Sequence, residues 1–127
     1  MRVLLDACVL YPSILRSLLM DCAKAGAFEP LWSARILEEW RRAADRNGIG
    51  AQAVVEIALL RADWPRADVA VSAGAEDTLT LPDVNDRHVL AAAIAGQARE
   101  LLTANTSDFP TRVLGGFGVV RRHPDEF

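Results

Sequence analysis

Short apolar runs alternate with longer amphipathic segments along this chain, and this alternation constrains the fold more than any other sequence feature. The runs predicted as strands are Arg2–Leu5, Phe28–Trp32, Val69–Ser72, Glu100–Thr103 and Val119–Arg121. Strands that alternate with helices form parallel sheets with helices on both faces. The sequence therefore predicts an α/β fold, a three-layer α/β/α sandwich around a central parallel sheet.

The segments between these runs carry the start and stop signals of helices. Helices are predicted from Ser13 to about Gly26, from Ser33 to about Gly48, from Ile49 to Trp64 and from Val84 to about Gln97. Ser33 is a candidate N-cap, because its hydroxyl can accept a hydrogen bond from a free backbone N–H in the first helical turn. Gly26 is placed to end the first helix.

Length and composition predict one soluble domain, residues 1–127. Hydrophobic residues make up 51% and charged residues 24%, which excludes collagen-like, coiled-coil and disordered chains. The net charge of −3 gives no general attraction for polyanions, so a nucleic-acid partner would need a local basic patch. The chain begins without a signal-peptide pattern, and its apolar run Val89–Ile94 is too short to cross a bilayer. A cytoplasmic protein with no membrane partner is expected. Cys8 and Cys22 are expected to be buried, reduced thiols rather than zinc ligands.

Several acidic residues fall where the predicted strands end. Asp6 closes the first strand, and Asp108 lies in the turn after the strand Glu100–Thr103. Asp83 and Asp86 stand at the start of the helix that leads into that strand. Ligands of parallel α/β sheets bind at the carboxyl ends of the strands. Carboxylates crowded there repel one another unless a divalent cation binds, so this pattern favours a metal site.

Two neighbouring glutamates separate on the predicted helix that follows Ser33. Successive residues are about 100° apart around a helix, which places Glu38 on the polar face with Arg41 and Arg42. Glu39 falls at the border of the apolar face. A carboxylate that faces the core needs partners, so Glu39 is the fifth candidate for the acidic site.

Each acid also has a structural explanation. Asp83 and Asp86 have the spacing of a capping-box variant, which stabilises a helix N-terminus without any chemistry. Asp108 can form a turn. Asp6 is harder to explain in this way, because an acid that ends a buried apolar strand is costly unless it is paired.

Three ordered segments of the chain resemble the motifs of PIN-domain ribonucleases. Leu4–Leu10 resembles the opening strand motif of that family, Leu81–Ile94 resembles its helix motif, and Leu101–Pro110 resembles its closing acidic motif. Ser33–Arg42 resembles its glutamate-bearing helix more loosely, and the tail His123–Phe127 is similar to the ending of one bacterial branch, the VapC-type toxins.

This resemblance implies a PIN fold and a metal-dependent endoribonuclease that hydrolyses RNA with Mg²⁺ or Mn²⁺. The catalytic acids that it implies are Asp6, Glu39, Asp86 and Asp108. The same four would be metal ligands, with Asp83 as an additional ligand or a plain N-cap. The resemblance also implies an antitoxin protein and a homodimer as partners. Many family members carry Asn two residues after the first aspartate, where this chain has Cys8.

Four further residues are candidates for contacts with RNA. Arg16 and Arg87 can contact phosphates, and Ser13 and Asn105 can donate hydrogen bonds near the same edge. An ion pair with the acid cluster or a solvated helix surface also explains the two arginines, and this explanation is slightly favoured. His88, alone on its helix face, is expected to be packed rather than catalytic.

Other functions remain open at this stage. The substitution at Cys8 motivates a PIN scaffold that binds RNA or a protein without cutting. A receiver-like phosphoacceptor is disfavoured, because the chain has only one lysine, Lys24, and it lies far from the last strand. A haloacid-dehalogenase phosphatase is disfavoured as well, since Cys8 stands at the second aspartate of that motif.

Overall fold

The computed structural model describes all residues from Met1 to Phe127. Its centre is a four-stranded sheet in the order β2-β1-β3-β4, with every neighbouring pair parallel. The strands are β1 (Arg2–Leu5), β2 (Glu29–Leu31), β3 (Glu100–Leu102) and β4 (Val120–Arg122). Both faces of β1 are buried, because Val3, Leu4 and Leu5 point alternately to opposite sides and are all 0% exposed. This is the predicted three-layer α/β arrangement.

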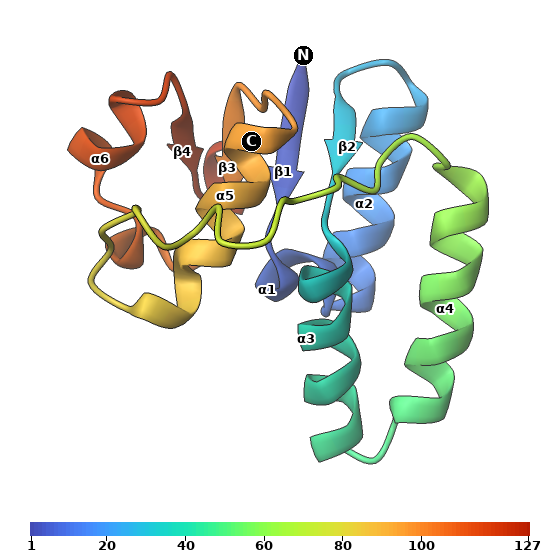
Figure 1. Cartoon of the computed structure of the whole chain (residues 1–127). Coiled ribbons are helices and arrows are strands. Elements are labelled where there is room, and N and C mark those ends of the chain that lie inside the picture. The colour runs from blue at the N-terminus through green and yellow to red at the C-terminus, as the bar shows by residue number, and fades with distance from the viewer.

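Six helices surround the sheet (Figure 1). They are α1 (Ala7–Leu10), α2 (Ser13–Lys24), α3 (Ala34–Arg46), α4 (Gly50–Asp63), α5 (Arg87–Ala95) and α6 (Thr111–Gly115). In Figure 1, α5 lies in front of the sheet, while α3 and α4 form a helical hairpin that extends below it. No helix is long and apolar enough to cross a membrane.

The predicted helix boundaries are largely confirmed. The Ser33 hydroxyl accepts a hydrogen bond from the backbone N–H of Ile36 at 3.2 Å, as expected of an N-cap. Gly26 follows α2 with a φ of +89°, a conformation that glycine adopts without strain. The helix predicted from Val84 begins as a 3₁₀ turn, Val84–Asp86, before α5. The short helices α1 and α6 were not expected.

Two sequence predictions are wrong. Val69–Ser72 is not a strand: the nearest pairing is an isolated parallel bridge between Trp32 and Asp68, the residue before the segment. The chain leaves β2 at Ser33 to begin α3, so no extended backbone remains for this segment to pair with. Cys22 is exposed rather than buried, because it lies on the outer side of α2, while Cys8 is half-buried.

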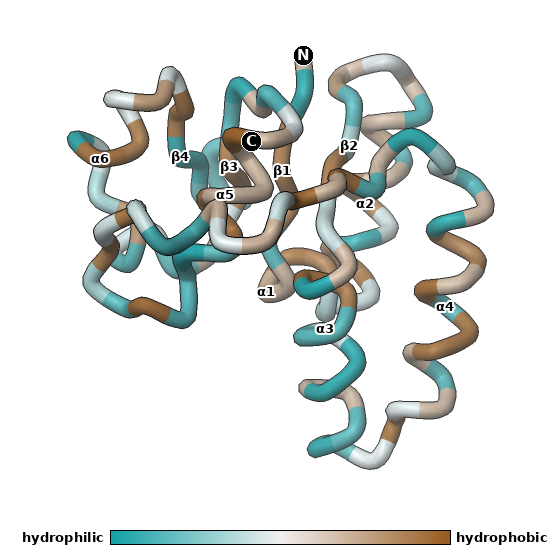
Figure 2. The backbone as a smooth tube through the Cα atoms, in the orientation of Figure 1, coloured by the Kyte–Doolittle hydropathy of each residue, from teal (hydrophilic) through white to brown (hydrophobic).

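The core fills both spaces between sheet and helices. Trp32, Trp40 and Phe109 are its largest members, and each is at most 2% exposed. Figure 2, coloured by residue hydropathy, shows hydrophobic residues in the central strands and mostly hydrophilic residues along α3. This core fixes the carboxyl ends of β1 and β3 side by side, because Leu5 pairs with Leu102.

Candidate active site

Asp6 follows β1 directly and is also the N-cap of α1. Its Oδ1 accepts a hydrogen bond from the Ala7 N–H at 2.8 Å, and the Thr103 hydroxyl donates to its Oδ2 at 2.9 Å. The residue is only 7% exposed. Burial raises the pKa of Asp6, the two hydrogen bonds oppose that rise, and the negative charge of Glu39 adds to it. Asp6 is therefore a buried acid held in one orientation.

Cys8 contributes to the support of Asp6. Its Sγ lies 3.6 Å from Asp6 Oδ2 and 3.5 Å from Thr103 Oγ1, and it accepts a hydrogen bond from the Ala104 N–H at 3.3 Å. Burial, followed by the charge of Asp6, raises the pKa of this thiol, so it keeps its proton at neutral pH. The thiol and the Thr103 hydroxyl together occupy the space beside the carboxylate.

Thr103 is a residue that the sequence reasoning missed. It was expected only as the last residue of a strand. Its position immediately after β3 is the available signal, because β3 neighbours β1 and the two carboxyl ends meet. A fully buried hydroxyl at that place donates to the acid that follows β1.

The pKa of Asp86 is raised by all four of the other acids. Burial raises its pKa most, and the charges of Asp108, Asp83, Asp6 and Glu39 raise it further, to about 6. All five predicted acids thus act on one region of the structure. Like charges that raise a pKa in this way leave negative charge uncompensated, which a cation would relieve.

Local structure explains how the helix acids are arranged. Asp83 Oδ1 accepts a hydrogen bond from the Asn85 N–H at 2.9 Å and caps the 3₁₀ turn, as the capping explanation predicts. Asp86 makes no capping hydrogen bond, so its carboxylate remains available. Asp108 ends the 3₁₀ turn Thr106–Asp108 that follows β3 and is half-buried.

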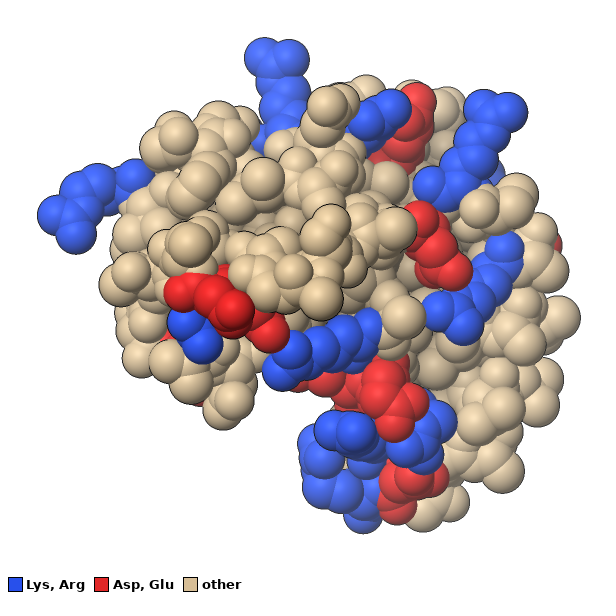
Figure 3. Space-filling model, in the orientation of Figure 1, with Lys and Arg blue, Asp and Glu red and all other residues tan.

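Glu39 and Glu38 separate on α3 as predicted. Glu39 Oε1 lies 3.0 Å from Nε2 of His88, which is itself only 6% exposed. Glu38 instead forms ion pairs with Arg41 at 2.6 Å and with Arg42 at 3.2 Å. Figure 3 shows arginine and acidic side chains interleaved over α3. The two glutamates are neighbours in sequence but belong to different electrostatic surroundings.

The five acids form no ion pair with lysine or arginine; the His88 contact of Glu39 is the single ionic contact among them. No three His, Cys, Asp or Glu side chains lie close enough together to hold a metal ion as they stand. The donor set is nonetheless entirely oxygen, which suits hard cations. Mg²⁺ keeps several of its waters and needs few direct carboxylate ligands, so these residues fit such an ion.

The predicted RNA-contacting residues lie in different surroundings. The Arg16 guanidinium donates to the carbonyls of Leu10 and Tyr11, pairs with Glu56 at 2.7 Å, and its Cζ lies 4.5 Å from the Trp40 ring centroid. These contacts connect α2 with α1, α3 and α4, and they explain the position of the Arg16 side chain without any contact to RNA.

The other three candidates are less engaged. Ser13 is exposed at the first residue of α2, and Asn105 is exposed beside the turn that carries Asp108. Arg87, at the start of α5, makes one long hydrogen bond of 3.4 Å to the Val84 carbonyl. Their contacts with RNA stay predictions.

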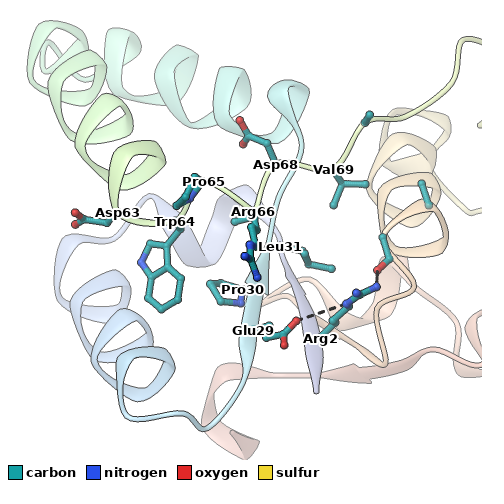
Figure 4. A pocket seen from close by; sticks show the side chains of 14 residues that line it. Arg2, Glu29, Pro30, Leu31, Asp63, Trp64, Pro65, Arg66, Asp68 and Val69 are labelled. Carbon is teal, nitrogen blue, oxygen red and sulfur yellow. Dashed lines mark hydrogen bonds and ion pairs between the residues drawn. The ribbon is translucent and has the colours of Figure 1, made fainter.

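Two cavities differ in their relation to the acids. The larger, of about 650 Å³, opens at the amino ends of β1 and β2 (Figure 4), whereas Asp6 follows the carboxyl end of β1. Its Arg2 and Glu29 pair with one another at 3.5 Å. A cavity of about 480 Å³ lies at Glu39 and is lined only by polar and charged residues. We take the second as the one relevant to the acids, because Glu39 is part of its wall.

Comparisons with known proteins place this geometry in a family. A family model described as PIN domain matches residues 2–107. Among solved structures, the chain is similar to one in the crystal structure of VapBC2 from Rickettsia felis bound to a DNA fragment from their promoter, with a TM-score of 0.67 and 18% identity over 97% of this chain and 98% of that chain. A comparison with curated proteins gives no match. The resemblance inferred from the three motifs is thus confirmed, and the chain belongs to the PIN domain family.

Proposed function

We propose that this PIN-domain protein is an endoribonuclease that hydrolyses RNA phosphodiester bonds with Mg²⁺ or Mn²⁺. The observation that carries the proposal is the gathering of five acids that form no ion pair with lysine or arginine. Burial, and then the charges of the other four acids, raise the pKa of Asp86 to about 6. A protein that used these residues only for packing would gain nothing from that repulsion. A metal site uses it, since each carboxylate strengthens the binding of a cation.

In this proposal Asp6 and Asp86 hold the cation directly, with Glu39 and Asp108 completing the ligand set or acting through water. Asp83 caps the turn that presents Asp86 and contributes charge. Thr103 and Cys8 orient Asp6. A bound cation supplies positive charge that offsets the charge developing on the phosphate oxygens, and it activates water as a nucleophile.

The protein's own residues would position the substrate. Ser13, Arg87 and Asn105 are the available donors, while the guanidinium of Arg16 is already engaged with Glu56 and with backbone carbonyls. Arginine binds phosphate in a bidentate manner, which suits a single-stranded RNA backbone. The proposed location of the protein is the cytoplasm, where RNA is made and used.

A protein partner is part of the proposal. Exposed apolar side chains gather on α2 and α4, whose Ile14, Leu18, Val55 and Leu59 are each at least 59% exposed. These two helices flank one cavity and are connected by the Arg16–Glu56 pair. Apolar patches of this kind mark protein interfaces. The similar structure contains VapBC2 bound to promoter DNA, so we propose an antitoxin partner and a homodimer, as in a toxin–antitoxin pair.

Cleavage of labelled single-stranded RNA by purified protein tests the function. We expect cleavage in Mn²⁺ or Mg²⁺, none in EDTA, and none by an Asp6→Asn variant purified identically. Melting temperatures measured with and without Mn²⁺ provide a second readout. Cleavage that persists equally in the variant would indicate a contaminating nuclease and contradict the proposal.

The second candidate is a PIN scaffold that binds without cutting. Cys8 favours it, since a thiol replaces the amide that many family members carry beside the first aspartate. The same experiment separates the two candidates. A scaffold shows neither cleavage nor a metal-induced rise in melting temperature, whereas a nuclease tested on the wrong RNA still shows the rise.

A further inference from the structure

A third cavity, distinct from the two described above, lies on the other side of the Glu39–His88 contact. It has a volume of about 420 Å³ and lies between the N-terminus of α3, the segment 69–76 and α5. Much of its wall is apolar, from Val69, Val71 and several alanines. A volume of this size is within the usual range of small-molecule sites, which are mostly apolar with a few directed polar groups.

His88 is a buried polar group of this cavity that lacks a hydrogen-bond partner. The side chain is only 6% exposed, and neither ring nitrogen makes a hydrogen bond. Its Nε2 makes an ionic contact of 3.0 Å with Glu39 Oε1 that does not have hydrogen-bond geometry, and Nδ1 has no hydrogen-bond partner. Buried polar groups without partners are rare, so a ligand that supplies the missing hydrogen bond is the simplest explanation.

Further hydrogen-bonding groups converge on the same cavity. The N-terminal residues of α3 line it, and Ser33 satisfies the N–H groups of Ile36 and Leu37. The N–H groups of Ala34 and Arg35 precede the first helical hydrogen bonds and remain without backbone partners. On the opposite wall stands the Glu76 carboxylate, which pairs with Arg35 at 3.1 Å. Donors and an acceptor thus face one apolar space.

The two cavities beside Glu39 adjoin one another. Arg35 lines both, and the close approach of Glu39 to His88 connects the wall of one to the wall of the other. The polar cavity also contains Arg42. An apolar space with hydrogen-bonding groups at one side matches the shape and chemistry of a nucleobase, and the adjoining polar cavity, which contains Arg35, Arg42, Glu38 and Glu39, connects it to the acids.

We propose that the cavity between α3 and α5 receives an unpaired nucleobase of the RNA substrate, with His88 and the amides of Ala34 and Arg35 contacting its polar edge. This inference rests on the proposed ribonuclease function and adds to it a subsite for one base next to the cut. The apolar walls exclude water from the base.

Nucleosides test the proposal without metal or phosphate. Adenosine, guanosine, cytidine and uridine are titrated in EDTA and followed by saturation-transfer NMR, with ribose alone as the control for the base. Ala73→Phe fills the cavity from an exposed position, and Ala75→Phe is its matched control on the same segment, because Ala75 does not line the cavity. Melting temperatures establish that both variants are folded.

At least one nucleoside is expected to bind the unsubstituted protein, while ribose does not. Ala73→Phe should weaken that Kd about tenfold or more, since the added ring takes the space of the base, and Ala75→Phe should leave it unchanged. The proposal is overturned if no nucleoside binds better than ribose, or if the two variants bind alike.

The two proposals fail separately in these experiments. RNA cleavage by a protein that binds no nucleoside overturns the base subsite alone. Nucleoside binding by a protein that shows neither RNA cleavage nor a metal-induced rise in melting temperature overturns the ribonuclease proposal and leaves a base-binding cavity, because the titration contains neither a metal nor a scissile phosphate.

Discussion

The acidic edge of the sheet and the outer face of α3 contain the same kinds of residue in opposite electrostatic states. On α3, Glu38 is paired with Arg41 and Arg42, and Arg41 also pairs with Asp45. These arginines lower the pKa of Glu38 to about 2, chiefly through the hydrogen bond from Arg41. At the acidic edge, burial and neighbouring carboxylates raise the pKa of Asp86 to about 6.

The difference teaches how to separate a functional acid from a structural one. Acids that have nearby arginines need no ligand and are explained by solubility and helix stability. Acids that face one another in a partly buried place cost stability, and a protein that keeps them gains something else in return. Glu38 and Glu39 make the comparison sharp, since they are chemically identical neighbours on one helix.

The largest expected effect comes from that pair. Glu39→Gln should lower kcat/KM for RNA cleavage about a hundredfold or more, because losing a group that acts on the transition state costs several kcal/mol and each 1.4 kcal/mol is tenfold. Glu38→Gln, on the arginine-paired side, should stay within about twofold. Initial rates in Mn²⁺ measure both. Equal losses in the two variants would remove the distinction between the two faces.

The support of Asp6 should give the next largest effect. Thr103→Val removes the hydroxyl that donates to Asp6 Oδ2 at 2.9 Å. Outer partners of metal ligands typically contribute about 10- to 100-fold in metal affinity or activity, and we expect a loss in that range. Thr103→Ser keeps the hydroxyl and should retain most of the activity. Metal titrations of melting temperature and cleavage rates check the pair, and a Thr103→Ser variant as impaired as Thr103→Val would argue against the hydrogen bond.

The pH dependence of stability should be a smaller effect. Without metal, Asp86 has a folded pKa of about 6 against an ordinary value of 3.8, so the folded protein binds its proton more tightly than the unfolded chain does. Its contribution to stability is therefore complete below about pH 4 and is lost as the pH rises through about 6.

Urea unfolding in EDTA across this range measures that contribution. Asp86→Asn should be less sensitive to pH than the unsubstituted protein, and its relative stability should grow as the pH rises. If the unfolding free energies of the two proteins change in parallel from about pH 4 to 7, the surroundings of Asp86 do not raise its pKa.

The smallest effect is expected on the arginine-paired face of α3. Glu38→Gln should barely change the melting temperature at physiological salt, because exposed ion pairs are screened and contribute little. The change should be larger in low salt. Thermal unfolding at two ionic strengths tests this, and a large loss of stability at both would show that the ion pairs matter to the fold.

Much of the fold followed from local patterns. The capping hydroxyl of Ser33 and the conformational freedom of Gly26 mark the start and the end of helices in the structure, as predicted. The failure at Val69–Ser72 has a different origin: its apolar composition suits a strand, but a strand needs a neighbour, and β2 has already ended where the segment passes. Pairing partners depend on where the rest of the chain lies, which local composition does not encode.

The sequence by itself determined the acids, their order and the family, because the spacing of Asp6, Asp86 and Asp108 is a property of the chain. It also separated Glu39 from Glu38, since the period of a helix fixes which side each occupies. Only the tertiary structure decided that Thr103 supports Asp6, that Arg16 points into the helix packing, and that His88 is buried beside Glu39 without a hydrogen bond. The physical reason is that hydrogen bonds and burial depend on distances between residues far apart in sequence, and the packing of the sheet and helices sets those distances.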